Sequence, residues 1–362
     1  MNQNKVKIIV GMSGGVDSAV ALFLLKKQGY DPIGVSLKYS LWGGNEEIMA
    51  TKREFNRTAF EKAEKVCKQF NVPYYIVDYE NEFRESVIEY FIKGLKNKIT
   101  PNPCVFCNKN IKIKHLLQFA DEHNIDLIAT GHYARIKNKN NKYELLRGKD
   151  KTKDQSYFLC LLGQDQLKRI IFPLGNYTKK KVYQIAKKEG LDYFSVNEQS
   201  QDLCFLSQKS IPLFLEKEVG IEEGDIVDSK GNILGKHKGL HFYTFGQRRG
   251  INISNGPWWV VGYNIDKNNL IISNNSKDKA LYSKEVILTN YSFVSGNIPT
   301  EPLKIKVKPR YVHPLVGAKI FPAKNGKMKL IFSQSQKLIT PGQWVVFYDG
   351  KVCLGGGMIE SI

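Results

Sequence analysis

The chain of 362 residues is short of acidic residues and of cysteines, and it has no long apolar run. No apolar stretch approaches the ~20 residues that a membrane-spanning helix needs, so we expect no membrane partner. The N-terminal sequence MNQNKVKIIVGM leads into a strand-like apolar run and does not resemble a signal peptide. We therefore expect a cytoplasmic protein, whose thiols stay reduced.

The deficit of acidic residues leaves a large positive charge. Lys+Arg number 54 against 35 Asp+Glu, a formal net charge of +19. The excess is spread along the chain, which favours a polyanionic partner such as nucleic acid bound through its phosphates. The alternative is that the charge only keeps the protein soluble.

Because thiols stay reduced in the cytoplasm, the six cysteines are candidates for chemistry or burial and not for a disulfide framework. Cys104 and Cys107 form a Cys-x-x-Cys step, but no second pair completes a zinc ribbon. Three options remain for this step: a dithiol exchange pair, a pair of thiols far apart in sequence, or a three-cysteine cluster site that includes Cys204. The other cysteines stand in apolar patterns and are expected to be buried and inert: Cys67, Cys160 and Cys353.

The pattern of elements predicts an α/β protein. Four β-rich runs, KIIVGM, PIGVSLKY, PYYIVDY and DLIATGHY, alternate with helical patterns in the first half, which indicates a parallel sheet covered by helices. Helices are expected after Val16 and over about residues 55–70, 82–96, 108–122 and 155–190. Beyond residue 225 Gly and Asn become frequent and alternating strands dominate, which predicts a small antiparallel barrel at the end of the chain.

The stretch GMSGGVDSAVALFLLKK, from Gly11 to Lys27, is typical of a phosphate loop. Its glycines let backbone amides approach a phosphate, and the helix that follows adds its positive end. It is not a Walker A loop, because no Gly-Lys-Ser/Thr follows. The pattern resembles the PP-loop ATP pyrophosphatases, which transfer AMP to their substrates.

Cys107 precedes the helical pattern NKNIKIKHLLQFA. A thiol at a helix N-terminus, close to Lys109 and Lys112, is expected to have a depressed pKa. Cys107 is therefore a candidate nucleophile.

Seven motifs in order resemble one family: SGGVDS, TPNPCVFCNKNIKI, IATGHYARI, KDQSYFL, SQDLCFL, FGQRRG and VCLGGGMIE. From about Lys5 to Ile359 the chain resembles the tRNA-specific 2-thiouridylases. The resemblance implies a Rossmann-like PP-loop catalytic domain over residues 1–210, a small mixed tRNA-binding domain over 211–282 and a C-terminal β-barrel over 283–362. It implies ATP-dependent 2-thiolation of the wobble uridine of tRNAs for Lys, Glu and Gln, with adenylation of the O2 oxygen and release of AMP and pyrophosphate.

The resemblance also implies roles for single residues. ATP would be held by Gly11, Met12, Ser13, Gly14, Gly15, Val16, Asp17, Ser18, Leu37 and Gly131. The target base would lie against Asn102, Pro103 and Cys104, and tRNA against His132, Lys153, Asp154, Gln155, Arg310, Tyr311 and Gln343. Cys107 matches the catalytic nucleophile, and Cys204 matches the cysteine that carries a persulfide. Mg²⁺ is expected with ATP, and a cysteine desulfurase or sulfur-relay protein as the sulfur donor.

The chain departs from the family at Cys104, where many members carry Asp. A carboxylate there can exchange a proton beside the base, which a thiol does poorly. Two hypotheses follow. Cys104, Cys107 and Cys204 hold a [4Fe–4S] cluster whose open iron delivers sulfide; or Cys204 carries a persulfide that Cys107 resolves.

Two other functions compete with thiolation. One is a PP-loop enzyme that adenylates a small molecule, of the amidotransferase or argininosuccinate-synthetase type, which needs neither the cysteines nor a large basic surface. The other is a non-catalytic RNA-binding protein that has kept a nucleotide pocket, against which the intact SGGVDS motif and both matched cysteines argue.

Overall fold

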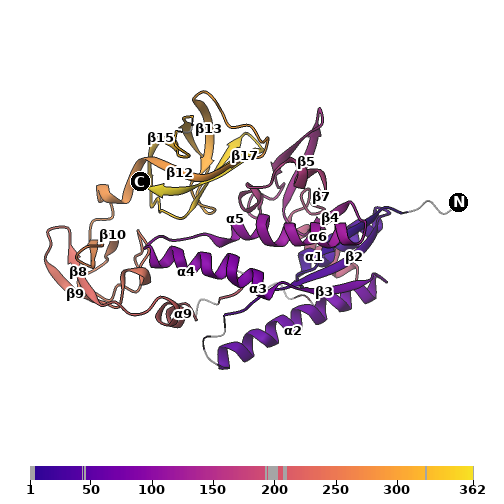
Figure 1. Ribbon diagram of the computed structural model, residues 1–362, viewed down its shortest axis with the longest axis horizontal. Coiled ribbons are helices and arrows are strands. Elements are labelled where there is room, and N and C mark those ends of the chain that lie inside the picture. The colour runs from indigo at the N-terminus through magenta and orange to yellow at the C-terminus, as the bar shows by residue number, and fades with distance from the viewer. Residues whose placement is uncertain are drawn as a thin grey trace.

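The computed structural model describes residues 5–42, 44, 46–191, 194, 203–206, 210–322 and 324–361. The fold is α/β, as predicted: a parallel-sheet domain, a small mixed sheet to one side and an antiparallel barrel above them (Figure 1). None of the helices in the described ranges combines the length and apolar character that crossing a membrane requires.

The parallel sheet has five strands in the order β3-β2-β1-β4-β7. Their bounds are β1 (Lys7–Gly11), β2 (Asp31–Lys38), β3 (Tyr74–Asp78), β4 (Leu127–Thr130) and β7 (Ile170–Ile171). The first four match the predicted strands. Ile8, Ile9 and Val10 of β1 are all fully buried, as expected for a central strand covered on both faces.

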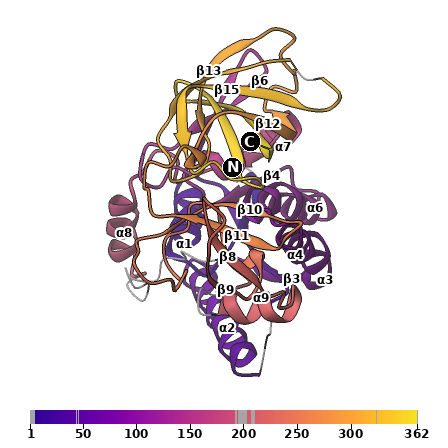
Figure 2. The same ribbon diagram turned by 90° about the vertical axis from the view of Figure 1, so that its left-hand side faces the viewer.

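One face of the sheet carries α1 (Val16–Lys27), α2 (Glu46–Gln69) and α8 (Lys179–Lys188), which share one apolar cluster with Ile8 and Val10. Figure 2 shows α8 beside α1. The other face is covered by α6 (Lys114–Glu122), whose Leu116 and Phe119 pack in a cluster with Ile9.

A helical region joins β3 to β4. It consists of α3 (Glu80–Phe83), the π-helical segment η1 (Arg84–Ile88), α4 (Glu89–Lys96), α5 (Pro103–Cys107), the π-helical segment η2 (Asn108–Ile113) and α6. The helix predicted over residues 108–122 therefore begins five residues earlier, at Pro103. Asn102 caps it by accepting a hydrogen bond from the Cys104 amide (3.3 Å), and Pro103 fits the first helical position.

The helix predicted over residues 155–190 is wrong as a single element. It is divided into the 3₁₀ turn η3 (Ser156–Leu159), α7 (Gln164–Lys168), the strand β7 and α8. Pro173 and Gly175 follow β7, and both residue types interrupt helices. A two-residue strand is too short to show a periodicity.

The mixed sheet comprises β8 (Gly224–Asp228), β9 (Ile233–His237), β10 (Trp259–Asn264) and β11 (Asn269–Ser273), preceded by α9 (Ile211–Glu218) and joined by the 3₁₀ turn η5 (Leu240–Phe242). The 3₁₀ turn η6 (Lys279–Leu281) leads from this sheet into the barrel.

The barrel strands are β12 (Tyr282–Phe293), β13 (Leu303–Lys308), β14 (Val316–Ile320), β15 (Met328–Lys337), β16 (Trp344–Asp349) and β17 (Val352–Ser361). They pair in the order β12-β15-β14-β13-β16-β17, and β17 pairs back to β12, which closes the barrel. The hairpin β5 (Ala134–Lys139) and β6 (Lys142–Arg147) pairs with β17 and so links the barrel to the parallel-sheet domain.

Candidate active site

The phosphate loop lies between β1 and α1, at the carboxyl edge of the sheet. Ser18 Oγ accepts a hydrogen bond from the Ser13 amide (3.2 Å) and donates one to the Gly15 carbonyl (2.9 Å), so it closes the turn from inside. Gly14 has a φ of +71°, and a Cβ there would lie 2.2 Å from the Ala59 carbonyl oxygen of α2. Only glycine fits this position, and the loop leads its backbone amides into the start of a 12-residue helix, an arrangement suited to phosphate.

Neighbouring strands bring the other predicted nucleotide residues to the same edge. Gly11 lies opposite Val35 of β2, and the half-buried Leu37 follows two residues later. Gly131 directly follows β4, and a Cβ on it would lie 2.9 Å from the carbonyl carbon of Asp17. The three strands β2, β1 and β4 thus frame one concave edge, where ligands bind in open parallel sheets.

Asp17, at the start of α1, does not stand alone. Lys179 Nζ of α8 lies 2.7 Å from each of its carboxylate oxygens, and the Tyr133 hydroxyl donates a hydrogen bond to Oδ1 (2.7 Å). The loop lacks the lysine of a Walker A motif, and the fold places a lysine beside it from a helix more than 160 residues away.

The two cysteines of the Cys-x-x-Cys step lie on one helix. Cys104 is in the first turn of α5 and half-buried; Cys107 is the last residue of α5 and 4% exposed. Residues three apart lie on the same face of a helix, so both thiols face the same way. Asn102 and Pro103, the other predicted base-binding residues, form the helix start that carries them.

The expectation of a depressed pKa at Cys107 is wrong. Burial raises the pKa of its thiol to about 12, against a lowering effect of Lys112, and burial raises the pKa of Cys104 to about 11. Cys107 is in the interior of a continuous helix that starts at Pro103, so it does not gain from the helix N-terminus. Lys109 acts instead on the buried thiol of Cys160.

Lys112 lies with the thiols because the helix widens after Cys107. In a regular α-helix a residue five positions on is turned by about 140° around the axis; in the π-helical segment η2 bonding over five residues brings it back toward the same face. Burial lowers the pKa of Lys112, but Cys107, Cys204 and Cys104 together outweigh it and raise the pKa of the ammonium. Within the described part of the chain no carboxylate pairs with Lys112.

Cys204 comes to the same place from a distant segment. Its thiol is exposed and acts electrostatically on both Cys104 and Cys107, which places the three predicted cysteines in one neighbourhood. Phe205 beside it is buried in an apolar cluster with Cys107 and accepts a hydrogen bond from the Trp42 amide (3.3 Å).

In the described residues, Cys104, Cys107 and Cys204 do not form a site for a single metal ion. Among the residues with described positions, no three His, Cys, Asp or Glu side chains are arranged to hold a metal ion. That finding concerns a single metal ion, so the [4Fe–4S] cluster on Cys104, Cys107 and Cys204 stays a prediction, and no step is derived through it. Cys67, Cys160 and Cys353 are buried, as predicted.

His132 links the thiols to the nucleotide edge. It follows Gly131, which packs on α1, and its Nδ1 lies 2.7 Å from Thr130 Oγ1. Burial and then Lys112 lower the pKa of His132 to about 3, so its ring is neutral. Lys112 acts electrostatically on both His132 and the cysteines, and Gly131 before His132 packs on Asp17 of the phosphate loop.

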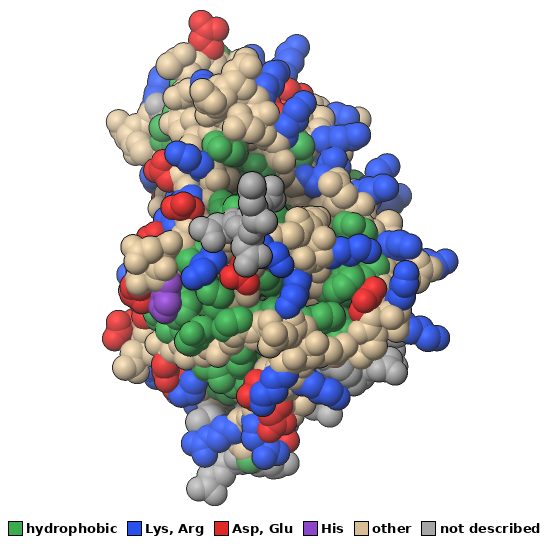
Figure 3. Space-filling model, turned by 90° about the vertical axis from the view of Figure 1, so that its right-hand side faces the viewer, with side chains coloured by type: hydrophobic (Ala, Val, Ile, Leu, Met, Phe, Trp, Pro, Cys, Tyr) green, Lys and Arg blue, Asp and Glu red, His purple; other side chains and the backbone are tan. Residues whose placement is uncertain are grey.

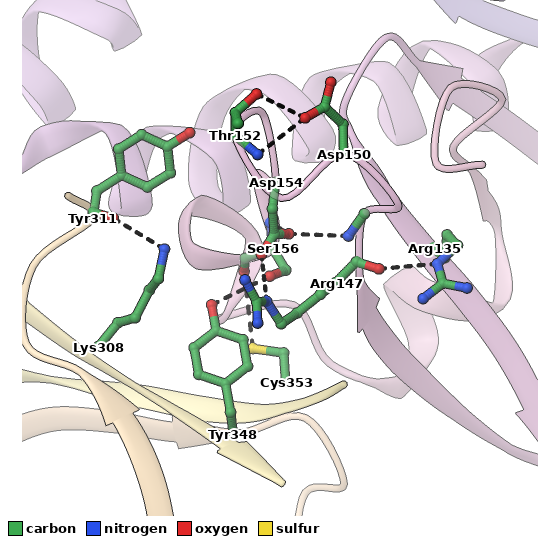
Figure 4. A network of polar contacts seen from close by, with 11 residues as sticks. Arg135, Arg147, Asp150, Thr152, Asp154, Ser156, Lys308, Tyr311, Tyr348 and Cys353 are labelled. Carbon is green, nitrogen blue, oxygen red and sulfur yellow. Dashed lines mark hydrogen bonds and ion pairs between the residues drawn. The ribbon is translucent and has the colours of Figure 1, made fainter. Parts of the chain in front are cut away.

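The predicted tRNA residues after β6 shape a loop. Asp154 is 2% exposed; its Oδ2 accepts from Arg147 Nε (2.7 Å) and its Oδ1 from the amides of Gly148 (3.0 Å) and Ser156 (3.1 Å) (Figure 4). Its side chain therefore holds the loop from within. Gln155 next to it exchanges two hydrogen bonds of 2.9 Å with the backbone of Tyr133, and Lys153 precedes both residues.

The barrel brings its own predicted residues against that loop. The Tyr311 ring lies 4.5 Å from the ring of Phe158, and its carbonyl accepts a hydrogen bond from Lys308 Nζ (3.1 Å; Figure 4). Arg310 Nη1 donates to the Leu338 carbonyl (3.5 Å). Two segments far apart in sequence thus meet at one junction between the domains.

Gln343 lies elsewhere. It is 8% exposed, and its side-chain Nε2 donates a hydrogen bond to the carbonyl of Thr100 (2.8 Å), just before the base-binding residues. This bond connects Gln343 to the segment before the cysteine helix, α5, which carries Cys104 and Cys107. Gln343 makes no such bond to Arg310 or Tyr311 among the described residues.

The surface matches the spread of charge in the sequence. On the face shown in Figure 3, Lys and Arg side chains line one margin from the barrel down to the parallel-sheet domain, and acidic side chains gather at the opposite margin. This distribution suits an extended polyanion better than a small anion.

Lys179 and Lys112 were missed as site residues by sequence reasoning. Lys179 stands in a run of lysines, KKK, where no local signal marks one of them. Lys112 was expected only as a neighbour that lowers the pKa of Cys107, and its influence on Cys104, Cys204 and His132 was not predicted.

Comparisons with known proteins agree along the whole chain. Residues 6–208 match the family model of the tRNA methyl transferase HUP domain, 213–274 that of the tRNA methyl transferase PRC-barrel domain and 283–359 that of the aminomethyltransferase beta-barrel domain. The tRNA-specific 2-thiouridylase MnmA of Halalkalibacterium halodurans is 40% identical over 99% of this chain and 95% of that protein. The one of Clostridium botulinum is 39% identical over 100% of both chains.

Among solved structures, the chain matches a 4-thiouridine synthetase–RNA complex with bound ATP over 59% of this chain and 50% of that one, at 16% identity and a TM-score of 0.33. That likeness is too distant to bear on function. The full-length identity to curated relatives and the matching family models show that this chain belongs to the tRNA-specific 2-thiouridylase family.

Proposed function

We propose that this protein replaces the O2 oxygen of the wobble uridine of tRNAs for Lys, Glu and Gln by sulfur, at the cost of ATP. The observation that carries the proposal is the common site of the phosphate loop and the three thiols, joined through Gly131, His132 and Lys112. We place the reaction in the cytoplasm, with a cysteine desulfurase or a sulfur-relay protein as sulfur donor.

In the first step the uridine O2 attacks the α-phosphorus of ATP, and pyrophosphate leaves. Backbone amides of the loop from Gly11 to Ser18 hold the phosphates, and Leu37 and Gly131 border the adenosine. The constrained Gly14 supports this role, because its φ of +71° and its contact with Ala59 preserve the turn. Mg²⁺ is the expected companion of ATP.

Lys179 supplies the cation that the loop lacks. Its ammonium lies beside the start of α1, where it donates to Asp17, and Tyr133 in turn donates to the same carboxylate. We propose that it moves from Asp17 to a phosphate oxygen when ATP binds, so that the negative charge of the departing pyrophosphate meets a fixed positive charge.

In the second step a sulfur nucleophile attacks C2 of the adenylated uridine. The terminal sulfur of a persulfide on Cys204 forms a bond to C2. The C2–O bond breaks, and the oxygen leaves as part of AMP. Cys107 then attacks the other sulfur, which frees the thiocarbonyl and forms a Cys107–Cys204 disulfide that an external reductant reopens. The exposure of Cys204 supports its role as the group that a donor loads. The positive charge of Lys112, which lowers the pKa of the Cys107 thiol against the effect of burial, supports Cys107 as the resolving thiol.

The cluster hypothesis gives a different sulfur carrier, and it can be tested by measurement. Iron and acid-labile sulfide are measured on protein purified without oxygen and on Cys104→Ala. About four of each per chain, lost in the variant, would replace the persulfide by a cluster. Thiolation by iron-free protein would leave Cys104 as a neighbour of the base.

The tRNA would lie across the junction where Lys153, Asp154 and Gln155 meet Arg310 and Tyr311, with its anticodon loop reaching His132. The closeness of Tyr311 to Phe158 supports this common surface. Asp154, being buried, would act by holding Lys153 and Gln155 in place.

The deciding experiment is nucleoside analysis of tRNA after incubation with ATP, a sulfur donor and the protein. We expect 2-thiouridine that depends on ATP. Its absence with every donor, together with AMP transfer to a small molecule, would favour the small-molecule PP-loop enzyme; tRNA binding without any ATP turnover would favour a non-catalytic RNA-binding protein.

A further inference from the structure

The turn between β15 and β16, residues 340–343, reaches out of the barrel to the segment that starts the cysteine helix. The Thr100 amide donates to the Pro341 carbonyl (3.0 Å), and the Asn102 amide donates to the Gly342 carbonyl (3.3 Å). Gln343 Nε2 completes the set with its bond to the Thr100 carbonyl (2.8 Å). Three hydrogen bonds therefore join two segments that lie some 240 residues apart.

The contact is tight enough to demand glycine. Gly342 has a φ of +86°, and a Cβ on it would lie 2.9 Å from both the carbonyl carbon and the oxygen of Thr100. The backbone of Gly342 therefore packs directly against the backbone of Thr100, without a side chain between them.

The turn is itself fixed by the barrel. The Gly342 amide donates to the Ile359 carbonyl (2.8 Å), and the Ile359 amide donates to the Gln343 carbonyl (2.8 Å). Thr340 is 3% exposed, and its Oγ1 donates to the Leu338 carbonyl (3.3 Å). Arg310, a proposed tRNA contact, donates to that same carbonyl.

What the turn holds is the start of α5. Asn102 caps this helix, and Cys104 and Cys107 lie in it, so a bond to the Asn102 amide fixes where the thiols stand relative to the barrel. A misplacement of a reacting group by about 1 Å is enough to lower a rate by about 100-fold.

We propose that residues 340–343 form a positioning clamp for the segment from Thr100 to Cys104, which leads into α5. Gln343 then acts on the reaction through Thr100 and not by contacting tRNA. The proposal rests on the proposed function and deepens it. The barrel then has two tasks: it presents Arg310 and Tyr311 to tRNA, and it holds the cysteine helix in register with them.

The test uses Gln343→Met, which keeps the side-chain volume and loses the donor, and Gln343→Glu as a second variant of the same shape. The matched control is Tyr157→Phe, which removes another buried hydrogen bond to the barrel, from the Tyr157 hydroxyl to the Trp344 carbonyl (2.8 Å). Amide hydrogen exchange of Thr100 and Asn102, tRNA affinity and single-turnover thiolation are measured for each variant.

Loss of one such hydrogen bond changes the equilibrium between the bonded and the open arrangement of the two segments by about tenfold. In both Gln343 variants we expect exchange at Thr100 and Asn102 to rise about tenfold and thiolation to slow at least as much, with tRNA affinity within about twofold of the parent. The control should leave all of these near the parent values. A loss of tRNA affinity as large as the loss of rate would make Gln343 a tRNA contact, and unchanged exchange would remove the clamp. Exchange needs no thiolation, so it tests the clamp even if the proposed function fails.

Discussion

Replacing Lys179 by Met tests the nucleotide site most sharply. The variant removes the ammonium that lies 2.7 Å from both oxygens of Asp17, and it keeps an unbranched stem beside the Tyr183 ring, 4.9 Å from the present ammonium. A hydrogen bond to a charged group contributes about 1.5–3 kcal/mol. If the ammonium meets a phosphate, ATP affinity should fall by about 10- to 100-fold.

The matched control is Lys180→Met. Lys180 is the next residue on α8 and is exposed, so this variant removes the same charge from the same helix without touching Asp17. Calorimetric binding of a non-hydrolysable ATP analogue and single-turnover release of pyrophosphate are compared in the two variants. Both should bind tRNA equally, because both lose one positive charge.

Two outcomes would refute the reasoning. Equal ATP binding and equal pyrophosphate release in the two variants would show that Lys179 only ties α8 to α1. Recovery of ATP affinity in the double variant Asp17→Asn, Lys179→Met would show that Lys179 only neutralises Asp17. A phosphate contact predicts that the double variant stays weak.

The remaining predictions concern the thiols and His132. Cys107→Ser and Cys204→Ser should each abolish 2-thiouridine while tRNA-dependent pyrophosphate release continues; thiolation by either variant would contradict its role. Burial and Lys112 hold the pKa of His132 at about 3 in the fold, whereas an unfolded histidine takes up a proton below about pH 6.5. The unfolded state therefore binds more protons, and the free energy of unfolding should fall as pH drops below about 6.5, by ~2 kcal/mol at pH 5 from this group. Urea unfolding at pH 7 and pH 5 should show a smaller loss in His132→Gln, and an equal loss in both proteins would rule this origin out.

The fold followed from the sequence where the signal is local and periodic. The strands β1 to β4 carry short β-rich runs, and the loop after β1 has its glycines between a strand and a helix. The two-residue β7 and the start of α5 did not follow. β7 is too short for a pattern, and α5 begins through a cap at Asn102 that looks like part of a loop when only the apolar run after Cys107 is read.

The candidate site was predicted in part for the same reason. Motifs marked the loop, Cys107 and Cys204, but the sign of the pKa shift at Cys107 was wrong because it depends on burial, which the neighbours of a residue in sequence do not reveal. The position of Lys112 depends on the π-helical segment η2, which no ideal spacing predicts.

The sequence by itself determined the phosphate loop, the strands β1 to β4 and the order of the domains, because strand, turn and helix signals act between residues close along the chain. Only the tertiary structure decided that Lys179 faces Asp17 and that the turn ending in Gln343 holds Thr100. These pairs are joined by packing across long chain separations. Packing depends on the whole set of buried surfaces, so no single stretch of the sequence contains it.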